Sequence, residues 1–168
     1  MSWNDELIKS AEQGNLAKVK ECLANGADVN ADDGRALRYA SNNGHFEIVK
    51  YLVKNGADVK NSGALRGASE YGHFEMVKYL VENGANMNNG LSGASRNGHF
   101  EIVKYLVENG ADVKNSGALR GASEYGHFEI VKYLVANGAN VNVGNCGKTA
   151  IDVAKNDEIR TFLEKNKN

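Results

Sequence analysis

Residues 44–53 read Gly-His-Phe-Glu-Ile-Val-Lys-Tyr-Leu-Val, and this phrase is the main indication of the fold because it recurs along the chain. Near-identical copies begin at Gly72, Gly98 and Gly126, and a fainter copy begins at Gly14. The steps between successive copies are 30, 28, 26 and 28 residues. A period in this range is typical of repeat proteins, in which each repeat is one unit of supersecondary structure.

Each copy of the phrase predicts an amphipathic helix. Ile48, Val49 and Leu52 fall at helical spacing on one face, and the Asn55-Gly56 pair that follows suits the left-handed end of a helix. Upstream, residues 36–41 read Ala-Leu-Arg-Tyr-Ala-Ser and predict another, shorter helix, which is echoed at 64–69 and 118–123. We call this upstream helix the first helix of the repeat and the helix formed by residues 44–53 the second. We therefore expect repeats of two antiparallel helices, each with an apolar face that only a neighbouring repeat can cover.

Residues 35–60 resemble the repeat of the ankyrin family, whose units read T-P-L-H-x-A-A-x-x-G-H-x-E-I-V-x-x-L-L-x-x-G-A-D-V-N. The resemblance spans the chain and implies an all-α solenoid of stacked helix-turn-helix repeats, with residues 1–168 as a single ankyrin repeat domain. It places an N-terminal cap repeat at 4–30, internal repeats at 31–60, 61–88, 89–114 and 115–142, and a C-terminal cap repeat at 143–168.

The chain departs from the family pattern in two ways. The repeats are shorter than the family period of about 33 residues, so we expect short loops in place of most β-hairpin fingers. The chain also has no proline, which the family places at the start of the first helix. We therefore expect side-chain caps at the starts of these helices, and the candidates are Asp33, Ser62, Asn89, Ser116 and Thr149.

The first helices contain glycines at Gly67, Gly93 and Gly121. A glycine inside a helix costs about 1 kcal/mol relative to alanine. We therefore expect a close approach between helices, or a groove, at these positions.

Composition argues against several kinds of partner. The net charge is −1 and the pI about 6.4, so the chain lacks the basic surface that binding to nucleic acid or an anionic membrane requires. No apolar stretch approaches the ~18 residues of a membrane span. The two cysteines, Cys22 and Cys146, lie far apart and favour a reducing compartment. We expect a cytoplasmic protein, with the nucleus as the alternative.

Motifs that could carry chemistry also have structural interpretations. The histidines His45, His73, His99 and His127 occupy one slot per repeat, so stacking would space them too widely to share a metal. Residues 147–149, Gly-Lys-Thr, lack the second glycine of a phosphate-binding loop, and we expect Thr149 to be a cap. No enzyme activity, metal, cofactor or small-molecule substrate is expected.

Aromatic residues recur on the second helices. The two series are Phe46, Phe74, Phe100, Phe128 and Tyr51, Tyr79, Tyr105, Tyr133. A stacking platform for nucleic-acid bases is one interpretation. Their regular spacing favours packing between repeats instead.

The residues that differ between repeats are candidates for partner recognition, because the stacking residues must repeat. The resemblance places the variable positions at the end of the first helix, on the concave side of the array. The candidate binding residues are Tyr39, Asn42, Asn43, Arg66, Glu70, Tyr71, Arg96, Asn97, Arg120, Glu124 and Tyr125. Tyrosine and arginine commonly carry interface energy, so Tyr71, Arg96 and Tyr125 are the expected anchors. Alternatively, the Arg66–Glu70 and Arg120–Glu124 pairs only stabilise their own helices.

The sequence therefore predicts a non-enzymatic module, monomeric by itself, that binds a partner protein or peptide on its concave face. The style of repeat resembles arrays in large DNA viruses and intracellular microbes, where such a chain acts as an inhibitor or adaptor. The alternative is an engineered or purely structural scaffold without a natural ligand. The near-duplicate segments 59–87 and 113–141 favour that alternative, whereas the irregular repeat length argues against it.

Overall fold

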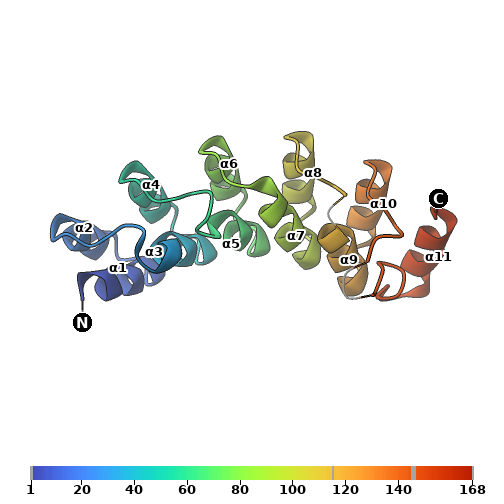
Figure 1. The fold of residues 1–168 in the computed structure, drawn as a ribbon, viewed down its shortest axis with the longest axis horizontal. Helices are drawn as coiled ribbons and strands as arrows, with labels where there is room; N and C mark the ends of the chain where they lie inside the picture. Colours follow the sequence, from blue (N-terminus) through green and yellow to red (C-terminus); the bar gives the residue numbers. More distant parts are fainter. Residues whose placement is uncertain (1, 115, 145–146, 168) are drawn as a thin grey trace. The chain divides into compact units, whose positions relative to one another are not determined.

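The computed structural model describes residues 2–114, 116–144 and 147–167, and within them the chain forms eleven helices and no strand (Figure 1). The helices are α1 Trp3–Glu12, α2 Leu16–Ala24, α3 Ala31–Asn42, α4 Phe46–Lys54, α5 Ala64–Glu70, α6 Phe74–Glu82, α7 Met87–Asn97, α8 Phe100–Glu108, α9 Ser116–Tyr125, α10 Phe128–Ala136 and α11 Asp157–Lys165. The predicted all-α fold with short connecting loops is confirmed.

The chain divides into two compact units, Met1–Asn86 and Met87–Asn168, which we call unit 1 and unit 2. In unit 1 the first helices α1, α3 and α5 pack side by side, and each contacts its own second helix, α2, α4 or α6. In unit 2, α7 packs on α9 and α8 on α10, and each first helix contacts its second helix. Within each unit the helix pairs are stacked as a solenoid.

Buried leucines on both helices of each internal repeat contribute to the core. Their exposed fractions do not exceed 2%, and they include Leu37, Leu52, Leu65 and Leu80 in unit 1 and Leu91, Leu106, Leu119 and Leu134 in unit 2. Burying an aliphatic side chain of this size contributes about 1.5–3 kcal/mol. The stack therefore depends on buried apolar side chains that recur in the helices with the sequence period.

Left-handed glycines stand where regular helix begins in α3 and α5, in place of the expected caps. Gly34 lies inside α3, at a kink that also includes Asp32 and Asp33, and Gly63 directly precedes α5. Gly34 and Gly63 have φ of 71° and 74°, and regular helix follows each. Asp33 is itself left-handed, with φ of 55°, and Asn89 lies inside α7, so both predicted N-caps are wrong. Glycine takes this conformation at little steric cost, which lets the chain turn into a helix without proline.

The predictions for Ser62 and Ser116 had different outcomes. The Ser62 hydroxyl accepts a hydrogen bond from the Ala64 N–H at 3.3 Å, one position before the N-cap Gly63. Ser116 is the first residue of α9 rather than its N-cap, and its side chain lies outside the described part of the chain.

Thr149 caps a turn, not a helix. Its N–H and its hydroxyl each donate to Asp152 Oδ2 at 2.8 Å, and these bonds lower the pKa of Asp152. Residues 150–153 form a turn, and α11 already has its N-cap at Asn156. The first helix expected in the last repeat is therefore absent, because the segment between Thr149 and Asn156 is too short for a helix and a loop.

Histidines join successive repeats. The Nε2 atoms of His45, His73 and His127 lie 3.0, 3.1 and 3.0 Å from the backbone oxygens of Glu12, Asn42 and Arg96. A carbonyl oxygen only accepts, so each Nε2 carries the proton. The structural interpretation is confirmed for these three histidines. In the last repeat Lys155 takes this role, and its Nζ donates to the Tyr125 oxygen at 3.3 Å.

Aromatic side chains on the second helices also pack between repeats. The ring pairs Phe46–Tyr79, Phe100–Tyr133 and Phe128–Phe162 meet edge to face, each with 5.5 Å between centroids. Such geometry is favourable for aromatic pairs. The packing interpretation of these residues is confirmed.

Asn30 connects the loops of two repeats in unit 1. Its side-chain amide donates to the Gly56 oxygen at 3.0 Å, and its Oδ1 accepts the Asp58 N–H at 2.7 Å. In unit 2 Asn88 Oδ1 accepts the Asp112 N–H at 2.8 Å. These amides hold the connecting loops where fingers would otherwise project.

We expect Asn30→Ala to lower the free energy of unfolding by about 1–3 kcal/mol, because two backbone groups lose their partner. Urea unfolding followed by circular dichroism measures the change. The control is Asn83→Ala, since the Asn83 amide donates only to Tyr79 of its own helix. An equal loss in both variants would contradict a role for Asn30 between repeats.

Candidate partner-binding surface

The predicted binding residues lie along the first helices and at their C-terminal ends, and we call the surface that they form the first-helix surface. Tyr39, Asn42 and Asn43 are at the end of α3, Arg66, Glu70 and Tyr71 on or just after α5, Arg96 and Asn97 at the end of α7, and Arg120, Glu124 and Tyr125 on α9. Each unit has its own part of this surface, on α3 and α5 or on α7 and α9.

Unit 1 has a depression of about 290 Å³ between α3 and α5, which we call the unit 1 depression. It is lined by Arg38, Asn42, Gly63, Arg66, Gly67 and Glu70. A Cβ atom at Gly67 would lie 1.8 Å from Asn42 Oδ1. The close approach expected at Gly67 is therefore confirmed, and the glycine forms the floor of the depression.

Unit 2 has a similar depression of about 270 Å³ between α7 and α9, which we call the unit 2 depression. It is lined by Ser92, Arg96, Gly117, Arg120, Gly121 and Glu124, each 54 positions after its counterpart in unit 1. A Cβ at Gly121 would lie 3.3 Å from Arg96 Cβ. Both depressions have a glycine floor and one wall formed by an arginine and a glutamate of α5 or α9. They differ in the residues of the other wall, which belong to α3 or α7.

The two tyrosines beside the depressions differ in how they are held. Arg96 Nη2 donates to Tyr125 Oη at 2.8 Å, and the guanidinium lies 5.0 Å from the ring centroid. The ring of Tyr71 instead stacks on that of His73, with 6.5 Å between the centroids, and Asn42 stands where unit 2 has Arg96. Tyr71 is 59% exposed and Tyr125 43%. Both rings are large apolar groups that reach solvent.

Some predicted binding residues are already engaged within the protein. The Asn43 and Asn97 amides donate to the Tyr39 and Gly93 oxygens, four residues earlier, at 2.8 and 3.0 Å. Tyr39 is half-buried, and the guanidinium of Arg38 lies 5.6 Å from its ring centroid. These contacts stabilise helix ends and leave Asn43 and Asn97 less suited to recognition than the arginines.

Both interpretations of the arginine pairs have support in the geometry. Arg66 Nε lies 3.9 Å from Glu70 Oε2, and Arg120 Nη2 lies 3.7 Å from Glu124 Oε2, so both ion pairs within a helix form. The side chains are partly exposed, and such pairs contribute little stability. The same four residues also line the depressions, and an ion pair does not exclude a role in recognition.

A groove was expected at Gly67 and Gly121, which line the depressions, but sequence reasoning missed Arg38, Ser92, Gly63 and Gly117. Arg38 and Ser92 occupy the same repeat position as Arg66 and Arg120. That alignment could have revealed them, whereas Gly67 and Gly121 gave a signal only as unfavourable residues inside helices.

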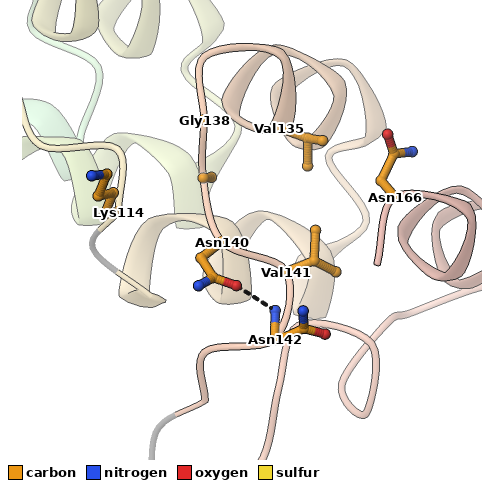
Figure 2. A pocket seen from close by; sticks show the side chains of 8 residues that line it. Lys114, Val135, Gly138, Asn140, Val141, Asn142 and Asn166 are labelled. Carbon is orange, nitrogen blue, oxygen red and sulfur yellow. Dashed lines mark hydrogen bonds between the residues drawn. The ribbon is translucent and has the colours of Figure 1, made fainter. Parts of the chain in front are cut away.

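The two largest of the further hollows lie away from the predicted residues. One in unit 2, of about 480 Å³, is lined largely by asparagines, valines and Lys114 (Figure 2). The dashed line in Figure 2 marks the hydrogen bond from the Asn142 N–H to Asn140 Oδ1, which measures 2.9 Å. The other, in unit 1, measures about 560 Å³ and shares Arg38 and Gly63 with the unit 1 depression.

The described residues contain no group of three His, Cys, Asp or Glu side chains that could hold a metal ion. Burial raises the pKa of the Cys22 thiol, which disfavours the reactive thiolate. Cys146 lies outside the described residues. None of the helices described is long and apolar enough to cross a bilayer.

Comparison with known proteins agrees with this architecture. The family model for ankyrin repeats (3 copies) matches residues 7–90, 68–145 and 91–167. Two ankyrin repeat proteins of Acanthamoeba polyphaga mimivirus are similar: one is 47% identical over 59 residues, covering 35% of this chain and 10% of the viral protein. The other is 49% identical over 37 residues, covering 22% of this chain and 28% of the viral protein. Ankyrin repeats are generally non-enzymatic modules for protein–protein interaction, and this chain belongs to the ankyrin repeat family.

Proposed function

We propose that this chain is a non-enzymatic module that binds a partner protein or peptide through its first-helix surface. The observation that carries the proposal is the pairing of Arg96 with the exposed Tyr125 beside the unit 2 depression. Tyrosine and arginine are enriched among the residues that dominate binding energy. A ring held by a stacked guanidinium loses little conformational freedom when a partner covers it.

The similarity to mimivirus ankyrin repeat proteins favours a viral or microbial origin, and the role that we propose there is that of an adaptor or inhibitor. The matched segments span about a tenth and about a quarter of those proteins. We therefore name the target by its class, which is another protein or a peptide. The chain is proposed to act as a monomer in the cytoplasm.

A second candidate function is a structural scaffold without a ligand. Residues 59–87 and 113–141 are nearly identical, as they would be in an array extended only to gain length. The different walls of the two depressions argue against this alternative, since a pure spacer has no need to vary them.

Replacing Tyr71, Arg96 and Tyr125 together by alanine is expected to weaken partner binding by about tenfold or more, because the exposed anchors are lost. Affinity capture from a lysate, with identification by mass spectrometry, supplies the partner, and titration of the purified pair gives the affinity.

The matched control replaces exposed residues of the second helices, Lys54→Gln and Lys104→Gln, and should leave the affinity unchanged. Circular dichroism verifies that both proteins are folded. A partner bound equally well by the folded triple variant would contradict the proposed surface, and the absence of any reproducible partner would favour the scaffold.

A further inference from the structure

We propose that the unit 2 depression binds the carboxylate side chain of an aspartate or glutamate in the partner. The inference rests on the proposed function and adds the chemistry of its central contact. The charged side chains that line the depression are Arg96, Arg120 and Glu124. Positive groups therefore outnumber negative groups by one, in a chain whose net charge is −1.

Arg120 has unused hydrogen-bonding capacity. Its Nε is buried and has no hydrogen-bond partner among the described residues. Its Nη2 lies 3.7 Å from Glu124 Oε2, which is beyond ordinary hydrogen-bonding distance. The Arg120 side chain is 32% exposed, so a carboxylate oxygen that reaches the Nη end of this guanidinium would form a bond that Glu124 does not supply.

Arg96 supplies a second cation whose position is already fixed. The hydrogen bond to Tyr125 Oη and the contact with the Tyr125 ring hold the guanidinium of this lining residue in place. A side chain that is ordered before binding loses less entropy on binding. Arginine also presents its donors in a planar fork that matches a carboxylate.

The size of the depression suits a side chain rather than a whole ligand. Its volume of about 270 Å³ is below the ~300–1,000 Å³ of typical small-molecule sites. Gly117 and Gly121 line it without side chains, which leaves room for an incoming group. A single excess positive charge is also too little for nucleic acid, whose affinity comes from neutralising several phosphates.

The unit 1 depression serves as an internal comparison. Ser92 and Arg96 are replaced there by Arg38 and Asn42. Arg38 also borders the neighbouring hollow, whose lining includes the carboxylates of Asp33 and Asp58. We therefore expect the unit 1 depression to bind an acidic side chain less well than the unit 2 depression.

A display library of random 12-residue peptides, selected on the immobilised full chain, tests the inference. Peptides are then titrated against the wild type, Arg96→Asn and Arg120→Gln. We expect the selected peptides to contain an essential aspartate or glutamate, and each variant to weaken binding by about tenfold. Replacing the peptide's aspartate by asparagine, or its glutamate by glutamine, should weaken binding to the wild type. The same replacement should have little further effect on the affinity of the Arg120→Gln variant.

Lys104→Gln is the matched control, because it removes one exposed positive charge from the same unit and should leave the affinity unchanged. The transplant Arg38→Ser with Asn42→Arg gives unit 1 the wall of unit 2. It should raise the number of peptides bound per chain from one to two, and it tests the inference even where a unit 2 variant fails to fold.

Selected peptides that bind without any acid would overturn the inference, and so would a selection that enriches no peptide. If such acid-independent peptides are lost in the Tyr71, Arg96 and Tyr125 triple variant, the proposed function stands without the carboxylate site. Peptides that bind the triple variant normally would contradict both. A 20-nucleotide single-stranded DNA that displaces the peptide at equal concentration would also overturn the inference.

Discussion

Gly98→Ala is expected to lower the free energy of unfolding by about 2–5 kcal/mol, from backbone strain and crowding of a neighbouring repeat. Gly98 has φ of +80°, a conformation that L-residues with a side chain rarely adopt. A Cβ there would lie 2.6 Å from Cε1 of His127. The ring would have to move and give up its hydrogen bond to the Arg96 oxygen.

Gly110→Ala is the matched control for backbone strain alone. Gly110 has φ of +98°, and a Cβ there would meet nothing within 4 Å. Its replacement should cost only the left-handed conformation, about 1–2 kcal/mol. Denaturant unfolding of both variants measures the difference, which is the contribution of the contact between repeats.

The same contact can be examined by a double-mutant cycle. In a His127→Ala background the ring is gone, so Gly98→Ala should cost no more than Gly110→Ala. An undiminished cost in that background would show that the destabilisation does not come from the histidine.

Leu119→Ala is expected to destabilise unit 2 by about 2–5 kcal/mol, the usual cost of a cavity left by a fully buried leucine. Leu119 is 2% exposed on α9, which packs against both α7 and α10. The cavity therefore weakens contacts within one repeat and between two repeats.

Hydrogen exchange detected by mass spectrometry measures where stability is lost after Leu119→Ala. Repeat proteins are stabilised mainly by nearest-neighbour contacts, so α7 and α9 should lose more protection than α3. Val107→Ala is the control, because Val107 on α8 is only half-buried and should cost much less. A uniform loss of protection over both units would contradict this local picture.

The repeat architecture was accessible from the sequence because stacking imposes the same residues in each repeat. Ile48, Val49 and Leu52 are buried at the positions that their helical spacing predicts. His45, His73 and His127 and the rings of Phe46, Phe100 and Phe128 were also assigned correctly to packing between repeats.

Helix starts were harder to predict, because they depend on backbone conformation more than on side-chain type. Asp33 and Asn89 are good capping residues in general, yet left-handed glycines or an earlier helix start replaced them. The missing helix before α11 follows from a small shortening of the chain, which residue type alone does not reveal.

The candidate site was only partly predictable. Sequence variation pointed to Arg96 and Tyr125, but not to the hydrogen bond between them. The depressions depend on how closely two helices approach at Gly67 and Gly121, a tertiary distance that no single repeat encodes. The asymmetry between Tyr71 and Tyr125 follows from the residue at one facing position, Asn42 or Arg96.

The shared floor and the different walls of the two depressions have an evolutionary consequence. A duplicated surface can accumulate changes in one copy while the other keeps its original contact. Substitution of Arg38 or Asn42 can therefore explore new targets without loss of the existing one. A target under selection to escape would have to evade two versions of the same surface on one polypeptide.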